Sequence, residues 1–162
     1  MHVLTFQVNN ETYAVDIWET QDVIAMIAIK PVLAAPGFLE GVINLRGVVI
    51  PIIDLLKRMG HPRAYYTYGN RIIISRLESA LVGFVVDRVV EIIDLPSDSM
   101  RTSTIKVDGQ EFSCNMAVLD GRGIIQIVRW EFFLNRRELV QLSHLESTLL
   151  AGAEASSESA RI

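Results

Sequence analysis

The feature that most constrains the fold of this chain is a series of short valine- and isoleucine-rich runs, each ended by a turn signal. Val3–Val8 alternates apolar and polar positions, an Asn-Asn-Glu turn signal follows, and Thr12–Ile17 resumes the alternation. β-Branched residues with a period of two favour strands, and a turn between two such runs favours a hairpin. Gln21–Ile29 fits a strand or a short helix, and two prolines make Lys30–Gly37 a connection.

A longer apolar run, Gly41–Ile53, is interrupted at Arg46 and Gly47, where we predict a tight turn or a bulge. Asp54–Met59 then has helical composition. Its aspartate is the predicted N-cap, and Gly60 is the predicted stop. The polar residues 61–70 form a predicted loop between two halves of the chain.

The second half repeats the strand pattern. Pro96–Thr104 is predicted as a loop, Trp130–Leu150 has leucines at helical spacing, and Ala151–Ile162 has the composition of a disordered tail. Nine or ten short strands with few helices predict an all-β barrel or sandwich. The predicted strands of this half are Arg71–Leu77, Leu81–Val86, Val89–Leu95, Asn115–Leu119 and Gly123–Val128.

Composition narrows the protein class. The 162 residues suit one domain, half of them are hydrophobic, and the formal net charge is −4, which argues against a nucleic-acid module. The longest apolar runs fall well short of the roughly 20 residues that span a bilayer. The N-terminus lacks the pattern of a signal peptide, and the single cysteine suits a reducing cytoplasm.

Signals for catalysis or cofactor binding are missing from the sequence. His2, His61 and His144 have no metal-ligand spacing, and Cys114 has no partner for a metal site or a disulfide. No phosphate-binding glycine motif occurs. We therefore predict no catalytic residue, no metal and no cofactor.

The interruption at Arg46 has two physical interpretations. A guanidinium at a break between two apolar strands is typically half-buried against a carboxylate or offered to a partner. The alternative is a structural turn with a solvent-facing arginine. Asn44 is able to hydrogen-bond backbone groups at this bend, and Gly47 supplies backbone freedom.

The stretch from Gly41 to Leu55, G-V-I-N-L-R-G-V-V-I-P-I-I-D-L, resembles the signature of the CheW-type coupling proteins of bacterial chemotaxis. The opening L-T-F-Q-V and E-T-Y-A-V-D-I resemble the first hairpin of that family. The segment A-P-G-F before Gly41 resembles the lead into the signature, and V-G-F-V-V-D-R-V from Val82 resembles a second-half block. The resemblance spans residues 3–134 in the order of the family.

The resemblance implies a fold of two five-stranded β-barrels around a shared core, with a short helix after the N-L-R-G strand and a C-terminal helix. It places a CheW-like domain at residues 1–150, with the barrels dividing near residues 60–70 and the termini crossing over, and leaves 151–162 as a disordered tail. It also implies a non-enzymatic cytoplasmic adaptor, recruited to membrane-associated arrays. Such an adaptor couples the regulatory domain of a CheA-type histidine kinase to the cytoplasmic tip of chemoreceptors, without nucleic-acid binding or membrane insertion.

The resemblance also assigns residues to partners. In this family a groove between the barrels holds the receptor, and the barrel ends dock onto the kinase. The implied kinase-binding residue is Asp22. An additional interface is predicted at Arg129, Trp130 and Phe133, because arginine and aromatic residues are enriched in interface cores. The implied receptor-groove residues are Ile17, Thr20, Asn44, Arg46 and Val89.

Alternative functions remain open at this point. Thr20 and Asp22 replace the aliphatic residue and glutamate common in the family, which leaves a paralogue of a pilus, gliding or transcription-controlling pathway as one alternative. A detached regulatory domain of a kinase is another within the family. An OB-type nucleic-acid-binding barrel and a hydrolase with dispersed carboxylates belong to other classes, and the acidic charge disfavours the first of these.

Overall fold

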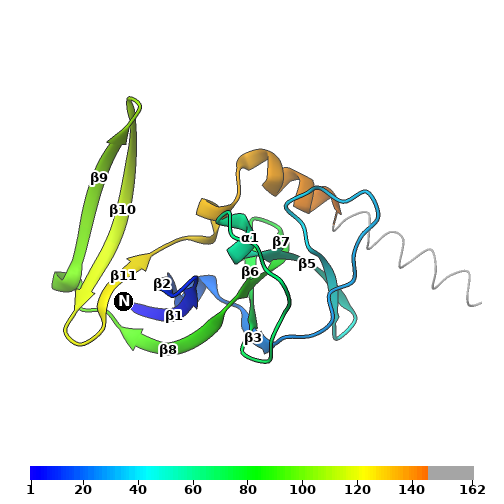
Figure 1. Ribbon diagram of the computed structural model, residues 1–162, viewed down its shortest axis with the longest axis horizontal. Helices are drawn as coiled ribbons and strands as arrows, with labels where there is room; N and C mark the ends of the chain where they lie inside the picture. The colour runs from blue at the N-terminus through cyan, green and yellow to red at the C-terminus, as the bar shows by residue number, and fades with distance from the viewer. Residues whose placement is uncertain (146–162) are drawn as a thin grey trace, which may run out of the picture.

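The computed structural model describes residues 1–145, apart from the side chains of residues 105, 107 and 112, and in this part the chain forms eleven strands in two sheets (Figure 1). The all-β prediction is confirmed. One sheet contains β1 (His2–Val8), β2 (Glu11–Asp16), β8 (Arg88–Asp94), β9 (Met100–Val107), β10 (Gln110–Leu119) and β11 (Gly123–Ile127). The other contains β3 (Asp22–Ala25), β4 (Gly41–Leu45), β5 (Val48–Asp54), β6 (Arg71–Leu77) and β7 (Ala80–Val86).

The six-stranded sheet has the order β8-β1-β2-β11-β10-β9 and joins the two halves of the chain. The predicted N-terminal hairpin forms at its centre, with Val8 opposite Glu11 across the two-asparagine turn. β1 pairs with β8 in antiparallel orientation, and β2 pairs with β11 in parallel orientation. The N-terminus is therefore held by strands that come more than 70 residues later in the chain.

The five-stranded sheet has the order β3-β6-β7-β5-β4. The predicted break at Arg46 and Gly47 is a two-residue turn, because Leu45 pairs directly with Val48 on either side of it. Helix α1 (Leu55–Arg58) follows β5, and Asp54 caps it by accepting a hydrogen bond from the backbone N–H of Leu56 at 3.0 Å. The short helix and its cap are confirmed.

Three apolar clusters divide the interior, and they confirm two barrel-like sheets around a shared core. One cluster lies within the six-stranded sheet and includes Val3 and Ile125. A second lies within the five-stranded sheet and includes Ile50 and Ile72. The third and largest draws residues from both sheets, from α1 and from the chain after β11. Alternation along β1 produces this division, because Val3 faces one cluster while Leu4, Phe6 and Val8 face the shared one.

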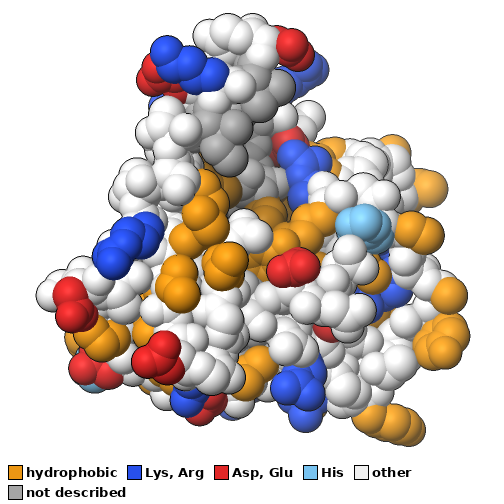
Figure 2. Space-filling model, turned by 60° about the vertical axis from the view of Figure 1, so that its left-hand side comes forward, with side chains coloured by type: hydrophobic (Ala, Val, Ile, Leu, Met, Phe, Trp, Pro, Cys, Tyr) orange, Lys and Arg blue, Asp and Glu red, His pale blue; other side chains and the backbone are white. Residues whose placement is uncertain are grey.

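The sheet that was expected to have five strands has six, because residues predicted as a loop form β9. The segment Arg101–Thr104 is polar, so it carries no apolar periodicity. With β10 it forms a hairpin that projects away from the rest of the molecule (Figure 1). Its described residues before Ala117 are exposed or half-buried, which explains a strand without an apolar face. Apolar side chains gather near the foot of this hairpin (Figure 2).

The chain after β11 forms the 3-10 turn η3 (Trp130–Phe133) and then a helix over residues 136–145. Asn135 and Glu138 form a reciprocal capping box at the start of this helix. A helix here is confirmed, but the predicted stretch begins with a 3-10 turn. The predicted helical residues 146–150 and the predicted tail 151–162 lie outside the described residues. Within residues 1–145 no helix is long and apolar enough to cross a membrane.

Candidate protein-binding site

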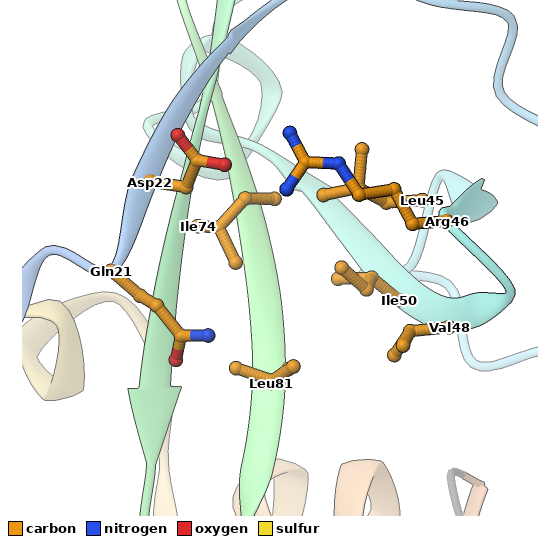
Figure 3. A pocket seen from close by; sticks show the side chains of 8 residues that line it. All are labelled: Gln21, Asp22, Leu45, Arg46, Val48, Ile50, Ile74 and Leu81. Carbon is orange, nitrogen blue, oxygen red and sulfur yellow. The ribbon is translucent and has the colours of Figure 1, made fainter.

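A pocket of about 300 Å³ opens at one end of the five-stranded sheet (Figure 3). Apolar side chains from four strands, β4 to β7, form its floor, and polar side chains stand on opposite sides of its mouth. Arg46 reaches over it from the β4–β5 turn, while Gln21 and Asp22 border it from the start of β3. The apolar lining residues are Leu45, Val48, Ile50, Ile74 and Leu81.

Arg46 occupies an unusual backbone conformation. Its φ is 52° and that of Gly47 is 84°, which is the pattern of a hairpin turn that normally selects asparagine or glycine at the first position. Asn44 supports the turn, because its Oδ1 accepts a hydrogen bond from the N–H of Gly47 at 2.8 Å. An arginine is a poor choice for left-handed backbone. Its presence points to a role for the side chain beyond the turn.

The two charges at the pocket mouth are available to a partner. Asp22 accepts a hydrogen bond from the backbone N–H of Val23 at 2.8 Å. Among the described residues neither Asp22 nor Arg46 forms an ion pair within 4.0 Å. The guanidinium of Arg46 points across the pocket toward Asp22 (Figure 3). An apolar floor between opposite charges suits a protruding apolar side chain of another protein.

The other predicted groove residues lie elsewhere. Ile17, in the 3-10 turn η1 (Ile17–Glu19), and Val89, on β8, both pack against the shared core, and Val89 pairs with Phe6. Thr20 follows η1, and its buried hydroxyl oxygen has no hydrogen-bond partner among the described residues. The structure thus groups Arg46 with Asp22, whereas Ile17 and Val89 belong to the junction of the two sheets.

The predicted additional interface is wrong for Trp130, whose side chain is fully buried. Its ring stacks on Phe84 and Phe6 at centroid distances of 4.5 and 5.5 Å, because the chain after β11 crosses the shared core. Phe133 is half-buried against the same cluster. Arg129 is exposed and lies 3.3 Å from a carboxylate oxygen of Glu19.

The sequence did not indicate a buried ionic cluster at Arg63. Its guanidinium binds the buried carboxylate of Asp54 at 2.5 and 3.0 Å and the carboxylate of Asp87 at 3.0 Å. Asp87 also accepts from the backbone N–H of Asn9, so the cluster connects both sheets. Burial and the nearby carboxylates of Asp54 and Glu40 raise the pKa of Tyr66, whose ring lies under Arg63. Arg63 belongs to an irregular loop, where no periodic signal marks a residue as buried.

The Arg46 pocket has the chemistry of a binding surface, with a guanidinium and a carboxylate around apolar side chains. No group of three or more histidine, cysteine, aspartate or glutamate side chains in this part of the chain is arranged to hold a metal ion. The pocket at Arg46 has no nucleophile beside a base. Its exposed guanidinium, half-buried carboxylate and apolar floor are features of a protein–protein contact.

A family model described as the CheW-like domain matches residues 2–138. The chain belongs to the CheW family. It is 32% identical to the chemotaxis protein CheW of Thermotoga maritima over 125 residues, which cover 77% of this chain and 82% of the relative. It is also 32% identical to that of Rhizobium meliloti over 124 residues, 75% of this chain and 80% of the relative.

A solved structure shares the fold. The scaffolding protein TtCheW from Thermoanaerobacter tengcongensis superposes with a TM-score of 0.70 at 31% sequence identity. The match covers 85% of this chain and 95% of the solved chain. The CheW-like assignment made from the N-L-R-G segment is confirmed by both comparisons.

Proposed function

We propose that this CheW-like protein is a non-enzymatic adaptor that couples a CheA-type histidine kinase to the cytoplasmic tip of chemoreceptors. It acts in the cytoplasm and is recruited to membrane-associated receptor arrays. Membership of the CheW family and the scaffolding role named for its structural relative support this proposal. The observation that carries it is the pocket at Arg46, where opposite charges flank an apolar floor.

Arg46 and Asp22 share one pocket, so one partner contacts both. Asp22 stands at a position that the family resemblance associates with the kinase, and the pocket lies at the end of a barrel-like sheet, where kinase docking is expected. We therefore assign this pocket to the kinase regulatory domain. An apolar side chain on its floor excludes water, which strengthens the charge contacts at the rim.

The receptor tip is assigned to the junction of the two sheets. Ile17 in η1 and Val89 on β8 are half-buried there and come from the two halves of the chain. Thr20 belongs to the same segment, because its backbone N–H donates to the carbonyl oxygen of Ile17 at 3.1 Å. A helical receptor segment would bury the exposed parts of these side chains, in the helix-in-groove mode.

The kinase assignment is tested with Arg46→Glu and a matched control, Arg136→Glu, which makes the same charge change at an exposed position on the C-terminal helix. Binding of the purified regulatory domain of a cognate CheA-type kinase is measured by titration calorimetry. We expect Arg46→Glu to weaken binding at least about tenfold, because it reverses the charge at the pocket mouth. Arg136→Glu should leave the affinity unchanged. Equal binding by all three proteins contradicts the assignment.

The receptor assignment is tested separately with Ile17→Glu. We expect this variant to lose binding to a receptor cytoplasmic fragment while its kinase affinity stays within about twofold, because Ile17 does not line the Arg46 pocket. Receptor-dependent autophosphorylation of the kinase gives the functional measurement. An adaptor must enhance it, so failure of the unmodified protein to do so removes the proposed function.

A further inference from the structure

A second cavity, of about 650 Å³, lies on the other face of the β4–β5 hairpin. Asn44 and Val49 pair across the hairpin and line this cavity, whereas the adjacent pair, Leu45 and Val48, lines the Arg46 pocket. The two linings have no residue in common, so the two sites are separate. The remaining lining residues are Ile27, Ala28, Lys30, Pro31, Val32, Val42 and Ile43.

The cavity borders a sheet edge that is only partly covered. β4 is an edge strand, and on its outer side Lys30 and Val42 exchange two backbone hydrogen bonds of 2.8 and 2.9 Å. Gly41 permits this approach, because a Cβ there would collide with the carbonyl oxygen of Lys30. Backbone groups on one edge recur every two residues, so the N–H and C=O of Asn44 face the same side. Within the described residues they have no hydrogen-bond partner.

Charge around the cavity has one sign. Lys30 is the only charged residue in the lining, and it is exposed. It forms no ion pair within 4.0 Å among the described residues. Apart from Asn44 the other lining residues are apolar. In an acidic protein of net charge −4, this cavity therefore offers a cation and an apolar surface without a competing carboxylate.

We propose that the outer edge of β4 binds an extended segment of a partner protein by strand addition. The segment pairs with the free backbone N–H and C=O of Asn44. It thereby extends along β4 the backbone pairing that Lys30 makes with Val42. One of its aliphatic or aromatic side chains enters the cavity, and a neighbouring carboxylate binds the ammonium group of Lys30. Main-chain pairing supplies affinity in this mode, and the side-chain cavity supplies selectivity. The proposal is independent of the kinase assignment, which uses the opposite face.

The test uses the full chain, labelled with ¹⁵N, and three blocked nonapeptides of alternating valine and threonine. The first carries one central glutamate, the second a lysine at that position, and the third a proline that removes a backbone donor. We expect the glutamate peptide to shift the amide resonance of Asn44 and to slow its hydrogen exchange. The lysine and proline peptides should bind at least about tenfold more weakly.

The matched protein variants are Lys30→Glu and Lys106→Glu, which change the net charge equally. Lys106 lies on the projecting β9–β10 hairpin. Lys30→Glu should reverse the preference between the glutamate and lysine peptides, and Lys106→Glu should preserve it. The proposal is overturned if the three peptides bind equally, if millimolar glutamate peptide leaves Asn44 unchanged, or if the shifts map to the Arg46 pocket. Protection of the Asn44 amide that disappears on dilution would show a second copy at this edge and would also overturn it.

Discussion

The segment at Trp130 and the turn at Arg46 lie at opposite extremes of burial, although both combine residue types that are common in protein interfaces. Trp130 is fully buried and stacks on rings from β1 and β7, so its surface contributes to folding. Arg46 is exposed, so it contributes little to packing. Its backbone is left-handed, a conformation that is unfavourable for an arginine. An aromatic residue after a strand is thus ambiguous between core and interface. A charged residue in an unfavourable turn position points more firmly to binding.

The largest expected effect is on stability at Trp130. Trp130→Ala should lower the free energy of unfolding by about 3–5 kcal/mol, because it leaves a cavity between Phe6 and Phe84. Urea denaturation followed by circular dichroism measures it. Phe132→Ala is the control, since Phe132 is 63% exposed, and its effect should stay below about 1 kcal/mol. Equal losses in the two variants would refute the core role of Trp130.

The same contrast explains which features were predictable. The N-terminal hairpin, the turn at Arg46 and the Asp54 cap depend on local patterns, and all three were predicted. β9 was missed because a two-stranded projection exposes both faces and leaves no apolar period.

The candidate site shows the same limit for long-range packing. Arg46 is recognisable in the sequence as an interruption between two apolar runs. Its position across one pocket from Asp22 depends on the curvature of the five-stranded sheet. The burial of Trp130 depends on the crossing of the chain over both sheets. Local spacing determines neither feature, so sequence reasoning did not bring Asp22 and Arg46 into one pocket and placed Trp130 at an interface.

A second arginine extends the comparison. The side chain of Arg63 is only 8% exposed, whereas Arg46 is exposed. Arg63→Met should destabilise the protein by about 3 kcal/mol, since it leaves the buried Asp54 carboxylate without its cation. Arg63→Lys should recover part of that loss, because it restores the charge but not the two-point contact. The measurement is again urea denaturation at neutral pH. A loss below about 1 kcal/mol for Arg63→Met would show that water replaces the ion pair.

Arg46→Asn separates folding from binding at the turn. Asparagine tolerates left-handed backbone better than arginine does, so the unfolding free energy should be unchanged or rise by up to about 1 kcal/mol. Kinase binding should weaken, because the guanidinium at the pocket mouth is removed. Thermal denaturation and calorimetric titration on the same sample give both values. A stability loss above about 2 kcal/mol would assign Arg46 a structural role instead.

The smallest expected effect lies at the boundary of the aromatic segment, where the carboxylate of Glu19 in η1 lies 3.3 Å from the guanidinium of Arg129. Burial, followed by the neighbouring Glu131 carboxylate, raises the pKa of Glu19 above its ordinary value of 4.5. The folded state therefore binds a proton more tightly than the unfolded chain does. Stability from this residue is lost as pH rises through the raised pKa and is regained below it.

Glu19→Gln removes this ionisation. We expect the variant to be more stable than the parent protein at pH 7, by less than about 1 kcal/mol because the exposed Arg129 partly compensates the charge. The difference should shrink as pH falls, because the native carboxyl becomes protonated. Urea denaturation at half-unit pH steps measures it, with the exposed Glu11→Gln as control. A variant that is less stable than the parent protein at pH 7 would mean that the Arg129 ion pair outweighs burial, and η1 would then be held to the aromatic segment by charge.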